Sequence, residues 1–162
     1  MLTAERIIEI LGLVPLADEG GMYLQNYLSE AQIDGRPGGS AIYYLLTAES
    51  FSHLNRLTGD EVYHFYMGDP VELCELKPDG STVITTLGTD IENGERPQHT
   101  VYAGVWQGSR LKQGGSWALI GTTMCPAFYP ECYEHGNAEE LKKQYPSAEA
   151  YIEALTGEIK AY

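Results

Sequence analysis

The sequence predicts an all-β fold, an antiparallel sandwich or barrel with short helices at its N-terminal and C-terminal ends. Seven short segments between residues 22 and 125 are rich in Tyr, Val, Ile and Thr, the residue types enriched in strands. Turn signals such as "DGRPGG", "KPDG" and "NGERP" separate these segments. No helical pattern lies between them to connect parallel strands, so we expect antiparallel pairing, for which a jelly roll closes most sheet edges.

A short helix is expected near the N-terminus. Thr3 is suited to cap its start and Gly12 to end it, with Pro15 beyond. Its apolar residues fall on one side, namely Ile7, Ile8, Ile10 and Leu11. We expect this helix to pack as a lid or as the arm of a dimer.

The strand-like segments begin after the turn "ADEGG". In order they are residues 22–29, 40–47, 61–68, 71–77, 81–88, 99–111 and 116–125. The chain then returns to helix: Asn137, with Glu140 three residues later, is typical of a helix start, and Ser147 is suited to cap a second helix before Gly157. There is no repeat or linker, so residues 1–162 are expected to form one domain with a sizeable core.

Composition excludes several partners. The formal charge is −13, from 23 acidic and 10 basic residues, and such a chain repels nucleic acid and anionic membrane surfaces. No apolar run is long enough to span a membrane, and the N-terminus lacks the pattern of a signal peptide. Cys74, Cys125 and Cys132 show no paired spacing, so we expect free thiols and a cytoplasmic location.

Polar side chains gather in residues 52–68, "SHLNRLTGDEVYHFYMG". Because side chains alternate along a strand, they divide between two faces: Glu61, Tyr63 and Phe65 on one, and Val62, His64 and Tyr66 on the other. We expect the first face to line the interior. Tyr63, Phe65 and Tyr43 would then wall a mostly apolar cavity with a few polar groups, as in small-ligand sites.

The same alternation brings further polar groups toward Glu61. If residues 52–56 are extended, His53 and Asn55 lie on one side and reach toward the face of Glu61. Gln107 is expected to point inward from segment 99–111, although a bulge or turn at Gly104 is able to change the register there.

These residues resemble the cupin superfamily, whose members are small jelly-roll barrels. Glu61-x6-Gly68 matches the end of the first cupin motif, and Gly104-x2-Gln107 falls where the second motif has its Gly and final His. One branch of small single-domain cupins of unknown function is similar over residues 11–146. It carries, in the same order, the blocks that read "EGG", "SAIYYLL", "NRLTGDEVYHFYMGDP", "TLG", "VYAGVWQ" and "CPAF" here.

The resemblance also implies where a metal would bind. Metal-binding cupins use three His and one Glu, which suit iron, manganese, nickel or zinc. The matching positions are His53, Asn55, Glu61 and Gln107, and two of these are neutral amides. We therefore expect no resident cofactor, and at most a divalent metal at low occupancy held by His53, Glu61 and Gln107. In the alternative interpretation, His53 and Asn55 are surface groups near a turn, and Glu61 pairs with Arg56 at the barrel mouth.

The other histidines receive separate predictions. His99 stands where a strand starts near the barrel rim and is expected to reach the ligand. His64 is expected to point away from the interior, and His135 to be solvated.

Three functions remain open. The first is binding of a small polar metabolite without catalysis, by the residues His53, Asn55, Arg56, Phe65, Tyr43, His99 and Gln107. The second is a metal-independent epimerase or isomerase acting on a sugar derivative, with Glu61 as general base and Tyr63 returning the proton. The third is a metal-dependent enzyme using His53 and Glu61. A homodimer is also expected, through outward apolar residues, namely Val62, Tyr66 and Trp106.

Overall fold

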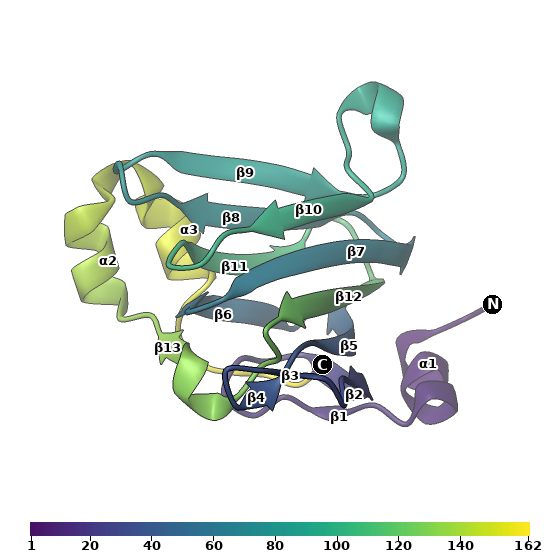
Figure 1. Ribbon diagram of the computed structural model, residues 1–162. Helices are drawn as coiled ribbons and strands as arrows, with labels where there is room; N and C mark the ends of the chain where they lie inside the picture. Colours follow the sequence, from purple (N-terminus) through teal and green to yellow (C-terminus); the bar gives the residue numbers. More distant parts are fainter.

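Two antiparallel sheets face each other in the computed structural model, which describes residues 1–162 (Figure 1). The six-stranded sheet has the order β1 (Val14–Pro15), β2 (Met22–Leu28), β5 (Ser40–Thr47), β12 (Trp117–Cys125), β7 (Asp60–Gly68) and β10 (Gln98–Val101). The five-stranded sheet has the order β13 (Tyr133–His135), β6 (Phe51–Leu57), β11 (Trp106–Leu111), β8 (Val71–Leu76) and β9 (Thr82–Leu87). A small hairpin, β3 (Gln32–Ile33) and β4 (Arg36–Pro37), projects from one end. The predicted antiparallel jelly roll is confirmed.

All seven predicted strand segments form strands, and one of them divides. Segment 99–111 turns at Gly104, which has a left-handed φ of 80° that favours glycine. β10 and β11 therefore lie in different sheets, while Val101 and Val105 on either side of the turn both point into the core between the sheets.

Five strands were missed, of which β1, β3 and β4 have only two residues each and β6 and β13 are longer. β6 covers most of the polar stretch before Glu61, and β13 pairs with it at the edge of the five-stranded sheet. β6 escapes prediction because its residues are polar yet buried, Ser52, His53 and Asn55 being at most 3% exposed. It also pairs with β11 through a register shift, which breaks simple alternation along the strand.

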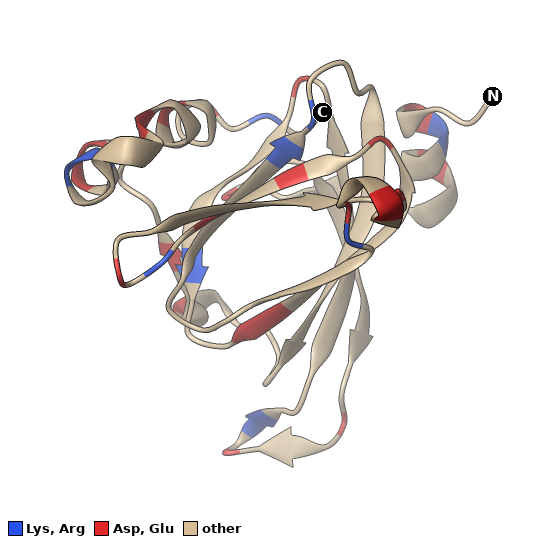
Figure 2. Cartoon of the chain, turned by 90° about the horizontal axis from the view of Figure 1, so that it is seen from above, with Lys and Arg blue, Asp and Glu red and all other residues tan.

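The core between the sheets is aliphatic and aromatic. It contains eleven buried residues, namely Tyr44, Leu46, Tyr63, Val71, Leu73, Leu87, Val101, Val105, Leu111, Ala118 and Ile120. Seen from above, the two sheets curve around this interior, and Lys and Arg are scattered along the chain rather than gathered on one face (Figure 2).

The N-terminal helix is α1 (Ala4–Leu11), with the predicted caps. Thr3 Oγ1 accepts a hydrogen bond from the Arg6 amide at 3.3 Å, and Gly12 is left-handed with a φ of 65°. Ile7 packs with Leu45 and Leu119, so α1 covers the outer face of the six-stranded sheet of its own chain.

The C-terminal helices α2 (Ala138–Gln144) and α3 (Glu149–Ala154) cover the outer face of the five-stranded sheet (Figure 1). Asn137 caps α2 as predicted, accepting from the Glu140 amide at 3.1 Å. The predicted cap at Ser147 is wrong, because the 3-10 helix η3 (Pro146–Ala148) occupies that position and α3 starts without a side-chain cap.

Two further 3-10 helices, η1 (Ile91–Asn93) and η2 (Pro130–Cys132), lie in connecting loops. None of the helices combines the length and the apolar composition that a membrane crossing requires. The three cysteines are free.

Candidate functional site

A cavity of about 180 Å³ opens on the inner face of the six-stranded sheet. Five polar residues and six apolar residues line it: Glu19, Gln25, Ser40, Glu61 and Thr122, with Leu16, Tyr23, Ile42, Leu57, Met124 and Phe128. Their positions follow from strand pairing, since Ile42 pairs with Thr122 and Ser40 with Met124 across β5 and β12, and each pair shares one face of the sheet.

Glu61 and Gln107 meet inside the barrel, as alternation predicts. The Gln107 side chain in β11 donates from Nε2 to Glu61 Oε2 in β7 at 2.7 Å, which links the two sheets. Gln107 is only 1% exposed, and its Oε1 has no hydrogen-bond partner in the protein. Glu61 keeps some exposure, toward the cavity that it lines.

The surroundings of Glu61 favour its protonated form. Burial raises the pKa of this carboxyl above its ordinary value, and hydrogen bonds with Thr122, Gln107 and Tyr63 offset only part of that effect. A carboxyl whose pKa is raised in this way is suited to hold or transfer a proton.

Glu19 is a second carboxyl at this cavity, and sequence reasoning did not identify it as a site residue. Ser52 Oγ donates to Glu19 Oε1. Burial, and after it the charge of Glu61, raises the pKa of Glu19 to about 8. Near neutral pH the cavity therefore holds a protonated Glu19 beside Glu61.

The turn that carries Glu19 is fixed by its two glycines and by the neighbouring strands. Gly20 has a φ of 100°, and a Cβ there would meet the Phe51 carbonyl oxygen at 2.4 Å. The Glu19 carbonyl accepts from the His53 amide at 2.8 Å, and the Gly21 amide donates to the Lys160 carbonyl at 3.0 Å. The signal for this site in the sequence was the acid placed directly before two glycines.

Three aromatic residues were expected to wall the cavity. Tyr63 and Phe65 do point between the sheets, but they pack in the core beside the cavity rather than lining it. The prediction for Tyr43 is wrong, because Tyr43 lies on the outer face near α1, and its neighbours Ile42 and Tyr44 point inward. Burial and the adjacent Glu61 charge raise the pKa of Tyr63 well above its usual range, so this hydroxyl stays protonated.

His53 and Asn55 are buried in β6 but do not line the cavity. Asn55 lies opposite Gln107 in the sheet and donates from Nδ2 to the His53 carbonyl at 2.8 Å. His53 Nδ1 lies 2.9 Å from the Leu54 carbonyl oxygen, and the ring stacks on His135 with centroids 3.7 Å apart. The interpretation of His53 and Asn55 as surface groups is therefore wrong.

Arg56 does not reach the cavity, because it follows Asn55 and points to the opposite face. Its Nε donates to Glu134 Oε2 at 2.6 Å, and its guanidinium lies 4.7 Å from the centre of the Trp106 ring. The predicted pairing of Arg56 with Glu61 is wrong. Trp106 points outward as expected, but α2 and α3 cover it and leave 8% exposed.

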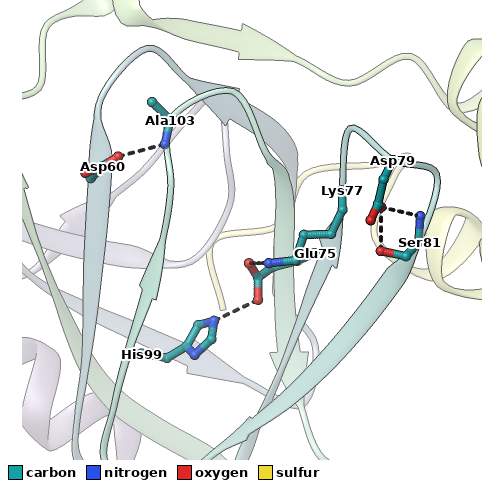
Figure 3. A network of polar contacts seen from close by, with 7 residues as sticks. All are labelled: Asp60, Glu75, Lys77, Asp79, Ser81, His99 and Ala103. Carbon is teal, nitrogen blue, oxygen red and sulfur yellow. Dashed lines mark hydrogen bonds and ion pairs between the residues drawn. The ribbon is translucent and has the colours of Figure 1, made fainter.

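His99 reaches a different carboxylate, Glu75 in β8. His99 Nε2 lies 2.7 Å from one Glu75 oxygen and Lys77 Nζ lies 2.9 Å from the other, the contacts marked by dashed lines in Figure 3. Glu75 is fully buried and pairs with Gln107 across β8 and β11, so it faces the interior. This cluster joins the two sheets without lining the cavity, and Glu75 was not predicted as a site residue.

The remaining histidines lie where predicted. His64 Nε2 is 3.1 Å from Thr123 Oγ1 on the face that points away from the interior, and His135 is exposed.

The residues at the matching positions do not fit a metal. The Gln107 amide is bound to Glu61, the Asn55 amide to a backbone carbonyl, and His53 to a carbonyl and the His135 ring. No three His, Cys, Asp or Glu side chains come together in an arrangement that could hold a metal ion. At the matching positions, imidazole and carboxylate donors therefore do not converge on one point.

Comparisons with known proteins match the whole chain. The model of the family described as "Cupin superfamily (DUF985)" matches residues 5–136. A structural-genomics protein from Shewanella oneidensis is 34% identical with a TM-score of 0.91, covering 97% of this chain and 99% of that one. A hypothetical protein from Leishmania major is 31% identical with a TM-score of 0.90, covering 97% and 100%.

A more distant likeness extends to the fold alone. Oxalate decarboxylase from Bacillus subtilis is 11% identical with a TM-score of 0.56, and the match covers 87% of this chain and 36% of the decarboxylase chain. No curated protein matches the sequence.

Proposed function

Since this chain belongs to the cupin superfamily, in the family described as DUF985, we propose that it binds a small polar metabolite in the cavity at Glu61. One observation carries the proposal: the Glu61 carboxyl, held by Gln107, opens into a cavity whose other walls are mostly apolar. A few converging polar groups on an apolar wall are the usual composition of a small-molecule site. The ligand-binding residues of this proposal are Glu61, Glu19 and Thr122, with Gln107 positioning Glu61.

A titration against small polar molecules tests this proposal. NMR shifts of cavity residues should reveal at least one ligand among short diols, amino alcohols and hydroxy acids that fit about 180 Å³. Removing the Glu61 charge takes away a charge-assisted hydrogen bond, so Glu61→Gln should weaken that ligand by about tenfold or more. Glu92→Gln, at an exposed acid in η1, is the matched control and should leave binding unchanged. The proposal would be refuted if the screen finds no ligand, or if Glu61→Gln leaves the affinity of every ligand found unchanged.

A metal-independent isomerase or epimerase is the second candidate, and the pair of carboxyls supports it. Proton transfer at a carbon needs a base and an acid near the working pH, and Glu61 and Glu19 both have raised pKa values. Glu19 is better placed than Tyr63 to be the acid, since Tyr63 does not line the cavity. Incorporation of solvent deuterium into a bound ligand would separate this candidate from binding alone.

We also propose that two copies pair through the outer face of the six-stranded sheet. Tyr66 and Met67 are 47% and 44% exposed there, and a second hollow, about 610 Å³ and lined mostly by apolar residues, runs between them and α1. An exposed apolar surface of this kind is typical of an interaction site. The unpaired cysteines suit a reducing compartment, and we propose a cytoplasmic location.

A further inference from the structure

The cavity lining holds carboxyl groups but no basic side chain. Two carboxyl groups line it, from Glu19 and Glu61, and its lining contains no Lys, Arg or His. Its remaining polar groups are the Ser40 and Thr122 hydroxyls and the Gln25 amide. The cavity therefore offers mainly carboxyl, hydroxyl and amide oxygens as hydrogen-bond acceptors, and it gains negative charge when a carboxyl gives up its proton.

The basic residues nearest the barrel interior are committed elsewhere. Arg56 pairs with Glu134 on the outer face, and Lys77 and His99 both pair with Glu75. Glu61 consequently has no cationic partner in the protein, and only the neutral Gln107, Thr122 and Tyr63 side chains contact it. A buried carboxylate without a counter-ion is costly, and a cation supplied by a ligand would remove that cost.

One further acceptor belongs to the same group of residues. Gln107 Oε1 is buried with no hydrogen-bond partner in the protein, although its amide nitrogen is held by Glu61. An ammonium group has three N–H donors and no acceptor. It therefore complements the carboxyl oxygens that line the cavity better than a hydroxyl or a carboxylate does.

We infer that the ligand of this cavity is a small primary amine whose ammonium group lies between the Glu19 and Glu61 carboxyls, an inference that rests on the ligand-binding function proposed above. The aromatic and aliphatic walls, which include Tyr23, Ile42 and Phe128, would hold a short carbon chain. At about 180 Å³ the cavity is smaller than the roughly 300–1,000 Å³ of drug-sized sites, so nucleotides and sugar nucleotides do not fit.

Three probes of similar size that differ in charge test the inference. They are 4-amino-1-butanol, 1,4-butanediol and 4-hydroxybutyrate, each titrated into the full chain at pH 7.5 and followed by NMR. We expect the amine to bind at least about tenfold more tightly than the diol, because only its ammonium group forms charge-assisted hydrogen bonds with a carboxyl that gives up its proton on binding. The hydroxy acid should bind more weakly than the amine, because the cavity lining offers its carboxylate no cationic partner.

Substitutions locate the site. Glu61→Gln and Glu19→Gln should each weaken the amine by about tenfold or more, whereas Glu92→Gln should not. If either variant fails to fold, the ranking of the three probes on the wild-type protein is decisive by itself.

The outcomes separate this inference from the proposed function. If the diol or the hydroxy acid binds as tightly as the amine and depends on Glu61, the amine inference is overturned and the ligand-binding function stands. If none of the three probes shifts the resonances of cavity residues, but another molecule does so and depends on Glu61, the amine inference is overturned and the ligand-binding function again stands. Amine binding that is unchanged in both carboxyl variants also overturns it, because the amine then binds outside the cavity.

Discussion

At the scale of single residues, the chemistry of the cavity depends on two carboxyls that lie far apart in the sequence. Glu61 comes from the start of strand β7, where alternation alone places it inside the barrel. Glu19 comes from a glycine turn that the His53 amide and Ser52 hold against β6. Together they form a coupled acid pair in which the protonation of one depends on the charge of the other.

The raised pKa of Glu19 predicts a specific pH dependence of stability. Glu19 stays protonated in the folded chain up to about 8 but ionises near 4.5 when unfolded, so the folded state binds the extra proton between those values. Its contribution to the free energy of unfolding is present below about 4.5 and is lost as the pH rises toward about 8. In wild type, the free energy of unfolding should therefore fall by a few kcal/mol as the pH rises, since each unit of pKa difference corresponds to about 1.4 kcal/mol. Glu19→Gln should remove this fall.

Urea denaturation of wild type and Glu19→Gln at several values between pH 5 and 8.5 measures this difference. The other titratable groups that face Glu19 are Glu61, Tyr44, Tyr63 and Tyr133, and these remain in both proteins. Glu92→Gln should follow the wild-type curve. If the free energy of unfolding changes with pH in the same way for wild type and Glu19→Gln, Glu19 ionises normally in the folded protein.

Some residue positions could be predicted from the sequence and others could not. Glu61, Gln107 and His64 were placed correctly because β7 and β11 are regular where these residues stand. Tyr43 was assigned to the wrong face because strand periodicity shows which residues share a face, but not which face meets the core when both are apolar. Arg56 was misplaced because its segment was not recognised as a strand.

At the scale of elements, the cluster of Glu75, Lys77 and His99 ties strand β10 of one sheet to β8 of the other. β10 is the edge strand of the six-stranded sheet, so this contact closes one side of the barrel. Burial of Glu75 acts to raise its pKa, but the hydrogen bonds and charges of His99 and Lys77 together lower it. The carboxylate therefore contributes stability above its ordinary pKa of 4.5, and this contribution is lost as the pH falls through its lower folded value.

His99→Gln should destabilise the fold by about 1–3 kcal/mol at pH 6, because it weakens the pairing of a fully buried carboxylate. Denaturant unfolding measures the change, and the difference from wild type should shrink below pH 4. Arg6→Gln is a control at a pair whose side chains are 57% and 71% exposed, and it should cost less than about 1 kcal/mol. Equal effects of the two substitutions would mean that Glu75 does not depend on His99.

The sequence predicted the strands that alternate and missed those that do not. β6 carries buried polar residues on one side and is covered on the other by α2 and α3, so neither face resembles a solvated strand face. Its register shift against β11 could not be read from composition. The helix caps at Thr3 and Asn137 were predicted correctly. The cap at Ser147 was predicted wrongly, because Pro146 starts the 3-10 helix η3 there.

At the scale of the whole molecule, the two outer faces differ. α2 and α3 cover the five-stranded sheet, whereas α1 covers only part of the six-stranded sheet and leaves Tyr66 and Met67 exposed. Trp106, expected at an interface between copies, is instead buried by its own chain. The proposed contact between two copies therefore involves α1, β7 and their neighbours on the outer face of the six-stranded sheet.

Met67→Glu should convert a dimer into monomers, because it places a charge in the centre of the proposed apolar contact. Light scattering after size-exclusion chromatography at about 50 µM measures the mass of each form. Tyr102→Glu, at a residue 64% exposed in the turn before β11, is the control and should not change the mass. A wild-type protein that is monomeric under these conditions, or a Met67→Glu variant that remains dimeric, would contradict the proposal.

The hydrogen bond from Gly21 to Lys160 means that residues outside the family match support the cavity. The family model ends at residue 136, yet the segment around residue 160 braces the turn that presents Glu19. Alignments restricted to the matched region would overlook this brace when relatives are sorted by the ligand they accept. For biochemical work, an affinity tag is better fused ahead of Met1 than after Tyr162, where it would stand two residues from the brace.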